Sequence, residues 1–442
     1  MAQVVLEPLG TVASASVNLY ERDRLARIHA LVACVWFVGL LSSPLIEAIA
    51  FGVLAPVGVV RWRAFWVLRH DRWLATGLLT YVLSIAWAAV SIAWAPEGAS
   101  ADLNLRLATA PLLVIHAGVR TPELRATCLL GGGYRVAVAA LMLVGTEFPA
   151  ALIPHHSSQE TPGVLVFGVA VFSTLAGVGW WRQPVMLPAA VLWAMAIAQV
   201  RSRATLIAVL SGALISLCTA KQPRGRRATA LAALAVAVLS LAWVLRESPL
   251  AVKIQSYVAI ASREADAAGQ LTAPSAIDAL LSRRLTIWDW TVRRLGDRWC
   301  FGHGAGSWRY DFKADVIANK SMSAWESSKG RITPQAHAHN LGLQIIYEFG
   351  LVGVVLVLAN LASWSACVWR AANPTTRAFG LAFLGSMLIS RMSGQGDLLG
   401  RASTLFFAGA ACLAACGCTK EAPARQSTAS ANDPARGKHI QA

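Results

Sequence analysis

Residues 344–368 read QIIYEFGLVGVVLVLANLASWSACV, and Glu348 is the only charged side chain in this run. A helix needs about 20 mostly apolar residues to cross the hydrocarbon core of a bilayer, so the run is long enough to do so. Inside a bilayer every backbone N–H and C=O must be paired within the protein, and a helix pairs its own. The run therefore predicts a transmembrane helix.

Apolar runs of similar character recur along the whole chain. Hydrophobic residues make up 56% of the 442 residues and charged residues 14%, whereas a soluble domain carries about 25% charged residues. No alternating strand pattern accompanies the runs, which argues against a β-barrel. We therefore expect an all-α integral membrane protein with about twelve transmembrane helices. Their expected limits are 28–43, 45–60, 73–95, 103–119, 126–146, 163–180, 184–199, 204–219, 228–245, 344–368, 377–393 and 400–418.

The distribution of charge predicts the orientation of these helices. The net charge is +16, and the Lys and Arg residues lie mostly in short loops such as 61–72 and 221–227 and in the C-terminal tail. With an even number of spans these segments share one side with the N-terminus, and the positive-inside rule places that side in the cytoplasm. Because topology accounts for the charge, we expect no nucleic acid partner. Arg135 falls inside the span at 126–146, so either that span begins later or the arginine has a partner.

The predicted topology divides the chain into five parts. They are a cytoplasmic N-terminal tail (1–27), transmembrane helices 1–9 (28–245), a periplasmic loop (246–338), transmembrane helices 10–12 (339–418) and a disordered cytoplasmic tail (419–442). The periplasmic loop is too long for a simple connector, so we expect it to be ordered or functional. Apolar residues recur within it at spacings of three and four, which predicts amphipathic helical structure lying on the membrane or on the bundle. These residues are Leu281, Leu285, Trp288, Val292, Leu295 and Trp299.

Three groups of polar residues fall on the predicted periplasmic face. They are Arg201 with Arg203, Arg283 and Arg284 with Trp288, and His337 and His339 with Asn340 and Glu348. An arginine near a membrane end can simply snorkel to the headgroups, and a pair of arginines can line a solvated helix face. Arg203, however, opens a helix, where the helix dipole does not stabilise a cation. A histidine here can act as a general base or be satisfied at an interface, whereas the His-x-His pair alone supplies too few ligands for a metal site.

The order of the motifs carries a family resemblance. Ser202-Arg203 opens a span, residues 284–288 are followed by the glycine-rich residues 302–306, and His339-Asn340-Leu341 is followed by residues 348–353, EFGLVG. Together these motifs resemble those of the O-antigen ligase and polymerase superfamily, over a region from about residue 185 to about residue 360. The family plan also places a large loop between the ninth and tenth spans. One departure is Trp299-Cys300, which stands where the family often has Asn-Pro.

The resemblance implies a reaction and its substrates. It implies a metal-independent, inverting glycosyltransferase of the O-antigen ligase family, with a C-type glycosyltransferase-like fold and no cofactor. The donor would be a glycan on undecaprenyl pyrophosphate, and the acceptor a sugar hydroxyl of lipid A-core. The enzyme would lie among the lipids of the bacterial inner membrane, with its active site facing the periplasm.

The resemblance also implies roles for the candidate residues. A pyrophosphate is a good leaving group already, so the paired carboxylates of glycosidases are not required. Arginine binds phosphate oxygens bidentately and stays charged, so Arg203 and Arg284 are expected to be catalytic. The acceptor hydroxyl must lose a proton, and His339 is the expected general base. The remaining candidates, expected to bind substrate or to orient the base, are Arg201, Arg283, Trp288, His337, Asn340 and Glu348.

Other functions remain open. A Wzy-type O-antigen polymerase or a protein O-oligosaccharyltransferase would share the donor and differ in the acceptor. The moderate length of the loop and the lack of an extra soluble domain favour the ligase. A transporter or flippase for a lipid-linked anion would also place basic residues at a cavity mouth, but it predicts internal repeats, and the sequence has no persuasive repeat.

Overall fold

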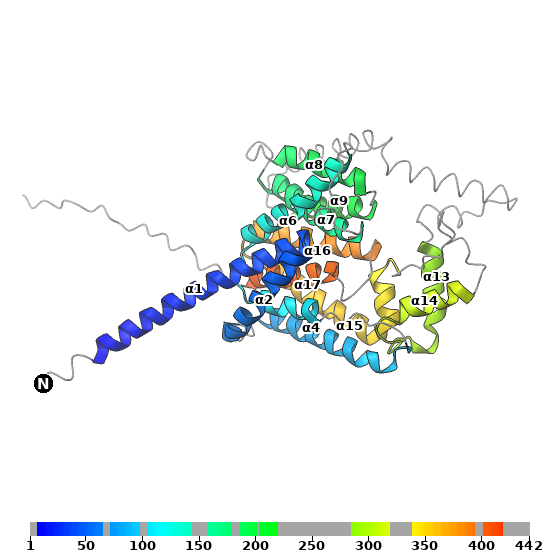
Figure 1. Cartoon of the computed structure of the whole chain (residues 1–442), viewed down its shortest axis with the longest axis horizontal. Coiled ribbons are helices and arrows are strands. Elements are labelled where there is room, and N and C mark those ends of the chain that lie inside the picture. The colour runs from blue at the N-terminus through cyan, green and yellow to red at the C-terminus, as the bar shows by residue number, and fades with distance from the viewer. Residues whose placement is uncertain are drawn as a thin grey trace, which may run out of the picture.

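The computed structural model describes residues 7–64, 71–97, 105–143, 157–178, 186–200, 203–219, 284–318, 338–393 and 401–418. Within these residues the chain is helical and contains no strand, which confirms the predicted all-α class (Figure 1). The helices are α1 (Glu7–Ser42), α2 (Pro44–Val60), α4 (Arg72–Ser91), η1 (Ile92–Trp94), α5 (Leu105–Val114), α6 (Thr121–Leu143), α7 (Ser157–Val178), α8 (Met186–Val200), α9 (Arg203–Thr219), α13 (Arg284–Leu295), η4 (Gly296–Arg298), α14 (Ser307–Ala318), α15 (Leu341–Trp369), α16 (Pro374–Ser393) and α17 (Arg401–Cys418).

Several helices have the length and composition of membrane spans. Three segments of the described chain are long and apolar enough to cross a bilayer, namely Arg24–Ser42, Arg72–Trp94 and Leu341–Trp369. Shorter apolar helices accompany them at Leu45–Val60, Pro162–Thr174, Pro188–Ile197, Ala204–Thr219 and Ser403–Gly417. These features are those of a membrane protein. The number of twelve spans stays a prediction, since the ninth expected span, 228–245, lies outside the described residues.

Some helix boundaries differ from the predicted ones. α1 begins at Glu7, so most of the expected N-terminal tail continues the first helix. α5 ends at Val114 instead of residue 119, because the chain turns through Gly118, whose φ of +78° is a left-handed conformation that suits glycine. α6 begins at Thr121 instead of residue 126.

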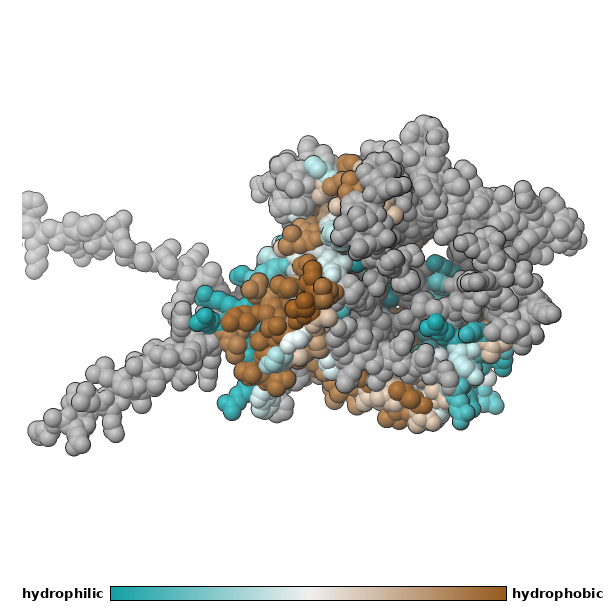
Figure 2. Space-filling model, in the orientation of Figure 1, coloured by the Kyte–Doolittle hydropathy of each residue, from teal (hydrophilic) through white to brown (hydrophobic). Residues whose placement is uncertain are grey.

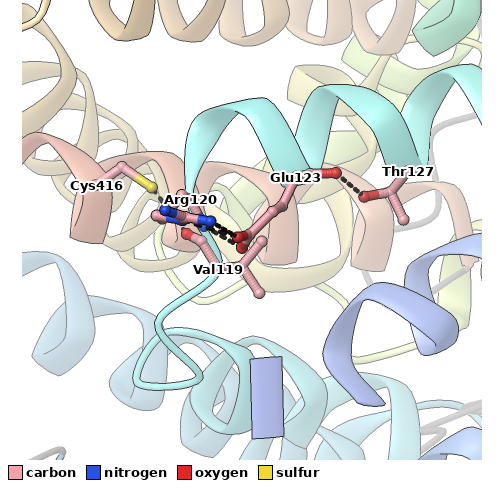
Figure 3. Close-up of polar contacts among 5 residues, drawn as sticks. All are labelled: Val119, Arg120, Glu123, Thr127 and Cys416. Atoms are coloured by element: carbon pink, nitrogen blue, oxygen red, sulfur yellow. Dashed lines mark hydrogen bonds and ion pairs between the residues drawn. The ribbon is translucent and has the colours of Figure 1, made fainter. Parts of the chain in front are cut away.

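The early start of α6 has a local cause in Arg120 and Glu123 (Figure 3). The Glu123 carboxylate accepts hydrogen bonds from the Arg120 backbone N–H at 3.0 Å and from Arg120 Nε at 2.8 Å. A glutamate at the third helical position that binds the N–H of the N-cap residue satisfies one of the unpaired donors at a helix start. In the same place Cys416 Sγ donates to the Val119 carbonyl at 3.0 Å, which joins this turn to the end of α17.

The helices of the bundle approach closely at small residues. Gly77 of α4 packs against the indole ring of Trp364 on α15, and its carbonyl oxygen accepts a 2.6 Å hydrogen bond from Asn360 Nδ2. Gly212 of α9 lies in the same way against Ser386 of α16. Small residues at such contacts let two helix backbones come together without voids, which is the usual packing of membrane helices.

The outer faces of the bundle expose large apolar side chains. Leu31 on α1 and Leu45 and Val60 on α2 are each more than 60% exposed, and Leu79 on α4 is 60% exposed. Figure 2 shows the resulting hydrophobic surface over α1 and α2, bordered by hydrophilic residues. A large contiguous apolar surface is unusual on a protein that faces water and marks a contact with lipid or with another protein.

Arg135 is buried and has partners, which decides between the two alternatives raised by the sequence. Its side chain is 2% exposed, and its Nε and Nη2 atoms donate hydrogen bonds to the carbonyl oxygens of Leu41 and Ser42 at 2.8 and 2.7 Å. These carbonyls belong to the last turn of α1, where the helix has no further N–H groups to offer and a positive charge is favourable. Arg135 therefore ties α6 to the hairpin that α1 and α2 form around Ser43.

α13 and α14 form a small unit at the end of the bundle opposite to the start of α1 (Figure 1). Its core contains Ile287, Trp308, Phe312, Ala338 and Tyr347. The predicted amphipathic pattern runs from Leu281 to Trp299, and α13 covers Arg284–Leu295 of it, while Leu281 lies outside the described residues. Leu285, Trp288 and Leu295 are half-buried, whereas Val292 and Trp299 are 58% and 52% exposed. The most buried positions of α13 are Ile287 and Thr291. Ile287 belongs to the same hydrophobic cluster as Trp308 of α14, and the Trp308 indole donates a 3.0 Å hydrogen bond to the Thr291 hydroxyl.

Candidate functional site

α15 is broken at Gly350, inside the EFGLVG motif. Gly350 has φ +65° and ψ −167°, which interrupts the helical hydrogen bonds on both sides of it. The carbonyl oxygens that the break frees find other donors. The backbone N–H groups of His303 and Gly304 donate to Tyr347 and Glu348 at 2.8 and 2.9 Å. The Trp87 indole of α4 donates to Phe349 at 2.9 Å.

The second half of α15 is held from the same loop. The N–H groups of Leu351 and Val352 donate to the carbonyl oxygens of Trp299 and Cys300 at 2.9 and 3.3 Å. A Cβ atom at Gly350 would collide with the Cys300 carbonyl, and the positive φ also favours glycine. The break is thus a docking site for the turn at residues 299–304. Because this turn binds α15 through its backbone, the departure at Trp299-Cys300 leaves the interaction intact.

Two glycines of the 302–306 motif fit closely between the helices. A Cβ atom at Gly302 would lie 2.5 Å from the Glu348 carbonyl, and one at Gly304 would lie 2.6 Å from Cα of Ala95. Both glycines have positive φ angles, of +77° and +97°. The two sequence motifs therefore meet in space and join the α13–α14 unit to the break in α15 and to the residues around η1.

His339 lies at the start of α15, between two anchored residues. On one side, the Ala338 carbonyl accepts a 3.0 Å hydrogen bond from the Trp288 indole of α13, and the Ala338 N–H donates to Gln344 Oε1 at 3.1 Å. On the other side, Asn340 caps α15, since its Oδ1 accepts from the Leu343 N–H at 3.2 Å. His339 itself is half-buried and has φ +52°, an uncommon backbone conformation for a residue other than glycine.

Glu348, one helical turn beyond Gln344 on α15, supports the backbone around His339. Its side chain is 6% exposed, and its Oε1 accepts a 3.0 Å hydrogen bond from Gln344 Nε2. Gln344 in turn holds the Ala338 backbone, so a chain of hydrogen bonds runs from Glu348 to the residue before His339. A buried carboxylate that accepts a hydrogen bond is stabilised in place, and here it fixes the orientation of the glutamine.

The structure brings together four of the residues singled out in the sequence. Trp288, His339, Asn340 and Glu348 meet where α13 contacts the start of α15. Arg284 opens α13 one helical turn before Trp288 and is half-buried. Arg203 opens α9, and the structure describes its backbone but not its side chain. Arg201, Arg283 and His337 lie outside the described residues.

Aromatic and charged residues behind this junction were not singled out in the sequence. Tyr347 stacks on His303, with ring centroids 4.4 Å apart, and its hydroxyl donates to Asp311 Oδ2 at 2.8 Å. Burial lowers the pKa of His303 below its ordinary value of 6.5. His303 Nε2 lies 3.0 Å from the Arg294 carbonyl. The imidazole is therefore a neutral donor that packs against α13 at neutral pH.

Asp315 of α14 completes the connection between the two short helices. Its carboxylate accepts hydrogen bonds from the Arg294 guanidinium at 2.6 and 3.1 Å and from the Trp290 indole at 2.9 Å. The Arg294 guanidinium holds the pKa of Asp315 below its ordinary value of 3.8. The contacts of Asp315 depend on how α14 folds back onto α13, which the sequence does not show.

α16 ends beside the same junction. Met392 lies close to Gly342, so that a Cβ atom there would be 3.4 Å from the Met392 methyl carbon. The preceding residue, Arg391, is 5% exposed and belongs to the last turn of α16, where a cation interacts favourably with the helix dipole. Arg391 was not among the candidates expected from the sequence. Across the described residues no group of three or more His, Cys, Asp or Glu side chains is placed to hold a metal ion.

A known protein family matches the part of the chain that contains this site. Residues 188–358 match a family model described as O-Antigen ligase. The matched region begins in α8, ends within α15 and contains all of the candidate residues. No curated protein matches the chain.

Proposed function

We propose that this chain, whose residues 188–358 match a family model described as O-Antigen ligase, transfers a glycan from undecaprenyl pyrophosphate to a sugar hydroxyl of lipid A-core. The family acts on lipid-linked glycans. The apolar helices would anchor this chain in the membrane in which such a donor resides. The proposed site faces the periplasm of a bacterial inner membrane, on a C-type glycosyltransferase-like fold.

The observation that carries the proposal is the placement of His339. Its two neighbours are fixed by hydrogen bonds from α13 and within α15, and Arg284 lies one turn from the tryptophan that makes one of them. A half-buried imidazole held in this way next to a guanidinium-bearing helix suits a reaction that needs a base and a diphosphate-binding cation.

The proposed chemistry is a single inverting displacement. The acceptor hydroxyl oxygen attacks the anomeric carbon of the donor sugar as the bond from that carbon to the diphosphate oxygen breaks. The hydroxyl proton passes to His339, and the electron pair of the broken bond leaves on undecaprenyl diphosphate. Arg203 and Arg284 bind the diphosphate oxygens, where a planar guanidinium makes paired hydrogen bonds and stabilises the growing negative charge. No metal ion and no cofactor is part of this proposal.

The other candidates have supporting parts in the proposal. Glu348 and Asn340 act as positioning residues, since both are bound to the backbone or to Gln344 around His339. Trp288 holds the Ala338 carbonyl and is proposed to bind substrate. The remaining basic candidates, proposed to bind substrate at the rim of the site, are Arg201, Arg283 and His337.

The experiment that tests the proposal uses the purified full-length protein in lipid nanodiscs with an undecaprenyl-pyrophosphate-linked glycan. Three parallel reactions offer lipid A-core, a glycan polymer end or a pilin-like protein as the acceptor. We expect transfer to lipid A-core, and a loss of about 100-fold or more in the rate for His339→Ala. Transfer to the polymer or to the protein alone would establish a polymerase or a protein glycosyltransferase instead.

Folding of the variant is checked separately from its activity. His339→Ala should keep the unfolding temperature and elution profile of the wild type, because His339 is only half-buried. Movement of the donor across the membrane without transfer to any acceptor would establish a carrier and overturn the proposal.

A further inference from the structure

Arg61 lies at the end of the bundle far from the proposed catalytic site. It follows the last residue of α2. The next described helix, α4, runs from Arg72 near this end to Ser91, whose carbonyl lies beside Gly304 of the α13–α14 unit. At about 1.5 Å per residue this helix spans about 30 Å, the thickness of the hydrocarbon core of a bilayer. Arg61 thus sits at the membrane surface that the charge distribution assigns to the cytoplasm.

Two hydrogen bonds fix one edge of the Arg61 guanidinium. Its Nη1 donates to Nδ1 of His29 on α1 at 2.9 Å and to the carbonyl oxygen of His116 at 3.4 Å. His29 is fully buried and His116 is 8% exposed. Arginine is always a donor, so His29 accepts through an unprotonated Nδ1. The guanidinium is therefore held against the bundle by two residues that cannot move into water.

The other edge of the guanidinium is available for a ligand. Both hydrogen bonds use Nη1, and the structure shows no partner for Nε and Nη2 within the part of the chain that it describes. Arg61 is half-buried, so this edge lies near the surface. The paired donors of Nε and Nη2 match the spacing of two oxygens of a phosphate group.

The surroundings of this edge are those of a lipid headgroup. Val59 and Val60 at the end of α2 are 64% and 68% exposed, and Trp62 just beyond it is 54% exposed. Tryptophan is enriched at the level of the headgroups, where its ring is apolar and its N–H reaches water. Acyl chains against Val59 and Val60 would carry a headgroup phosphate to the level of Arg61.

The local charge favours an anion. Arg24, Arg27 and Arg63 accompany Arg61, and all three are exposed. Between positions 24 and 64 the only acidic residue is Glu47, which lies in the first turn of α2 at the opposite end of that helix from Arg61. Asp23 precedes Arg24 in the sequence, and the carboxylate of Asp71 accepts hydrogen bonds from the Trp73 and Leu74 N–H groups at the start of α4. Basic groups between helix ends on the cytoplasmic side are the usual setting for binding anionic lipid headgroups.

We propose that Arg61 and Arg63 bind the phosphate group of an anionic phospholipid whose acyl chains lie along α1 and α2. The fixed guanidinium of Arg61 supplies the paired hydrogen bonds, and the exposed Arg63 adds charge. This lipid site is separate from the proposed glycan-transfer site and does not depend on it.

The test measures binding of phosphatidylglycerol and of phosphatidylcholine to the delipidated full-length protein in detergent, by native mass spectrometry and by the shift in unfolding temperature. We expect phosphatidylglycerol to bind more tightly and to raise the unfolding temperature, with little effect of phosphatidylcholine. Arg61→Gln should weaken phosphatidylglycerol binding by about tenfold, the effect of losing charge-assisted hydrogen bonds. Arg63→Gln should weaken it less.

Arg120→Gln is the matched control, because Arg120 lies on the same predicted membrane side, is exposed and pairs with Glu123 (Figure 3). It should bind phosphatidylglycerol as the wild type does. Equal losses in Arg61→Gln and Arg120→Gln would mean diffuse attraction and overturn the proposal, as would equal binding of the two lipids. Equal stabilisation by inorganic phosphate would also overturn it, since the site would then not require a lipid. If Arg61→Gln does not fold, unchanged binding in Arg63→Gln and in Arg61→Lys would be contrary to the proposal.

Discussion

The indole nitrogen of Trp288 donates a 3.0 Å hydrogen bond to the carbonyl oxygen of Ala338, the residue before His339. This bond joins α13 to the start of α15 and carries the position of one helix to the other. Replacing Trp288 by Phe keeps a ring but removes the donor. We expect the transfer rate to fall by about tenfold, the effect of a lost hydrogen bond of about 1–2 kcal/mol.

The matched control for this change is Trp299→Phe, since Trp299 is 52% exposed in the same unit. Its transfer rate should equal that of the wild type. Equal rates for the wild type and Trp288→Phe would show that the bond to Ala338 has no part in the reaction.

Gly350→Ala should destabilise the protein. The new Cβ would collide with the Cys300 carbonyl, and the alanine would have to adopt the φ of +65° that Gly350 has. Holding a residue other than glycine at φ +65° and ψ −167° costs about 1–3 kcal/mol, and the collision adds to this. We expect a clearly lower unfolding temperature than for Gly52→Ala, because a Cβ at Gly52 meets no atom within 4 Å. Similar unfolding temperatures for the two variants would argue against the helix break.

Glu348 variants separate a positioning role from a role of its charge. Glu348→Gln keeps an oxygen that can accept the hydrogen bond from Gln344, whereas Glu348→Ala removes it. If Glu348 orients Gln344 and, through it, Ala338, the glutamine variant should keep most of the transfer rate and the alanine variant should lose it. Equal loss in both variants would indicate that the negative charge itself is needed.

The α13–α14 unit should lose stability in mild acid. Burial lowers the pKa of His303 below 6.5, so the folded protein binds its proton less readily than the unfolded chain does. The unfolded chain therefore takes up more protons between the folded pKa and 6.5, and stability falls as the pH drops through this window. We expect the unfolding temperature to fall between pH 7.5 and pH 5, and less steeply in His303→Asn. The same slope in both proteins would exclude His303 as the titrating group.

Much of the fold could be predicted from the sequence because hydropathy reports directly on the surroundings of a helix. The run at 344–368 falls within α15, and the turn at Ser43 separates α1 from α2. The break at Gly350 could not be predicted, since residues 349–359 continue the apolar run across it. Its cause is the turn at residues 299–304, which binds α15 through the backbone and leaves no pattern in the side chains.

The candidate site was predicted in part for a similar reason. Asn340 and Glu348 could be singled out because they are polar residues at the head of an apolar span. Their partners, Leu343 N–H and Gln344, became known only from the structure. Arg135 shows the opposite case. The sequence identified a charge inside a span, but its acceptors, Leu41 and Ser42, lie more than 90 residues away in the chain.

The central claim is that guanidinium groups bind the diphosphate while His339 removes the proton, and binding of a short-chain polyprenyl diphosphate tests it most directly. The measurement compares the wild type with Arg203→Gln, Arg284→Gln and His339→Ala by calorimetry in detergent. We predict that each arginine variant binds about tenfold or more weakly, and that His339→Ala binds like the wild type although it does not transfer the glycan. Unchanged binding in both arginine variants, or loss of binding in His339→Ala, would contradict this assignment of roles.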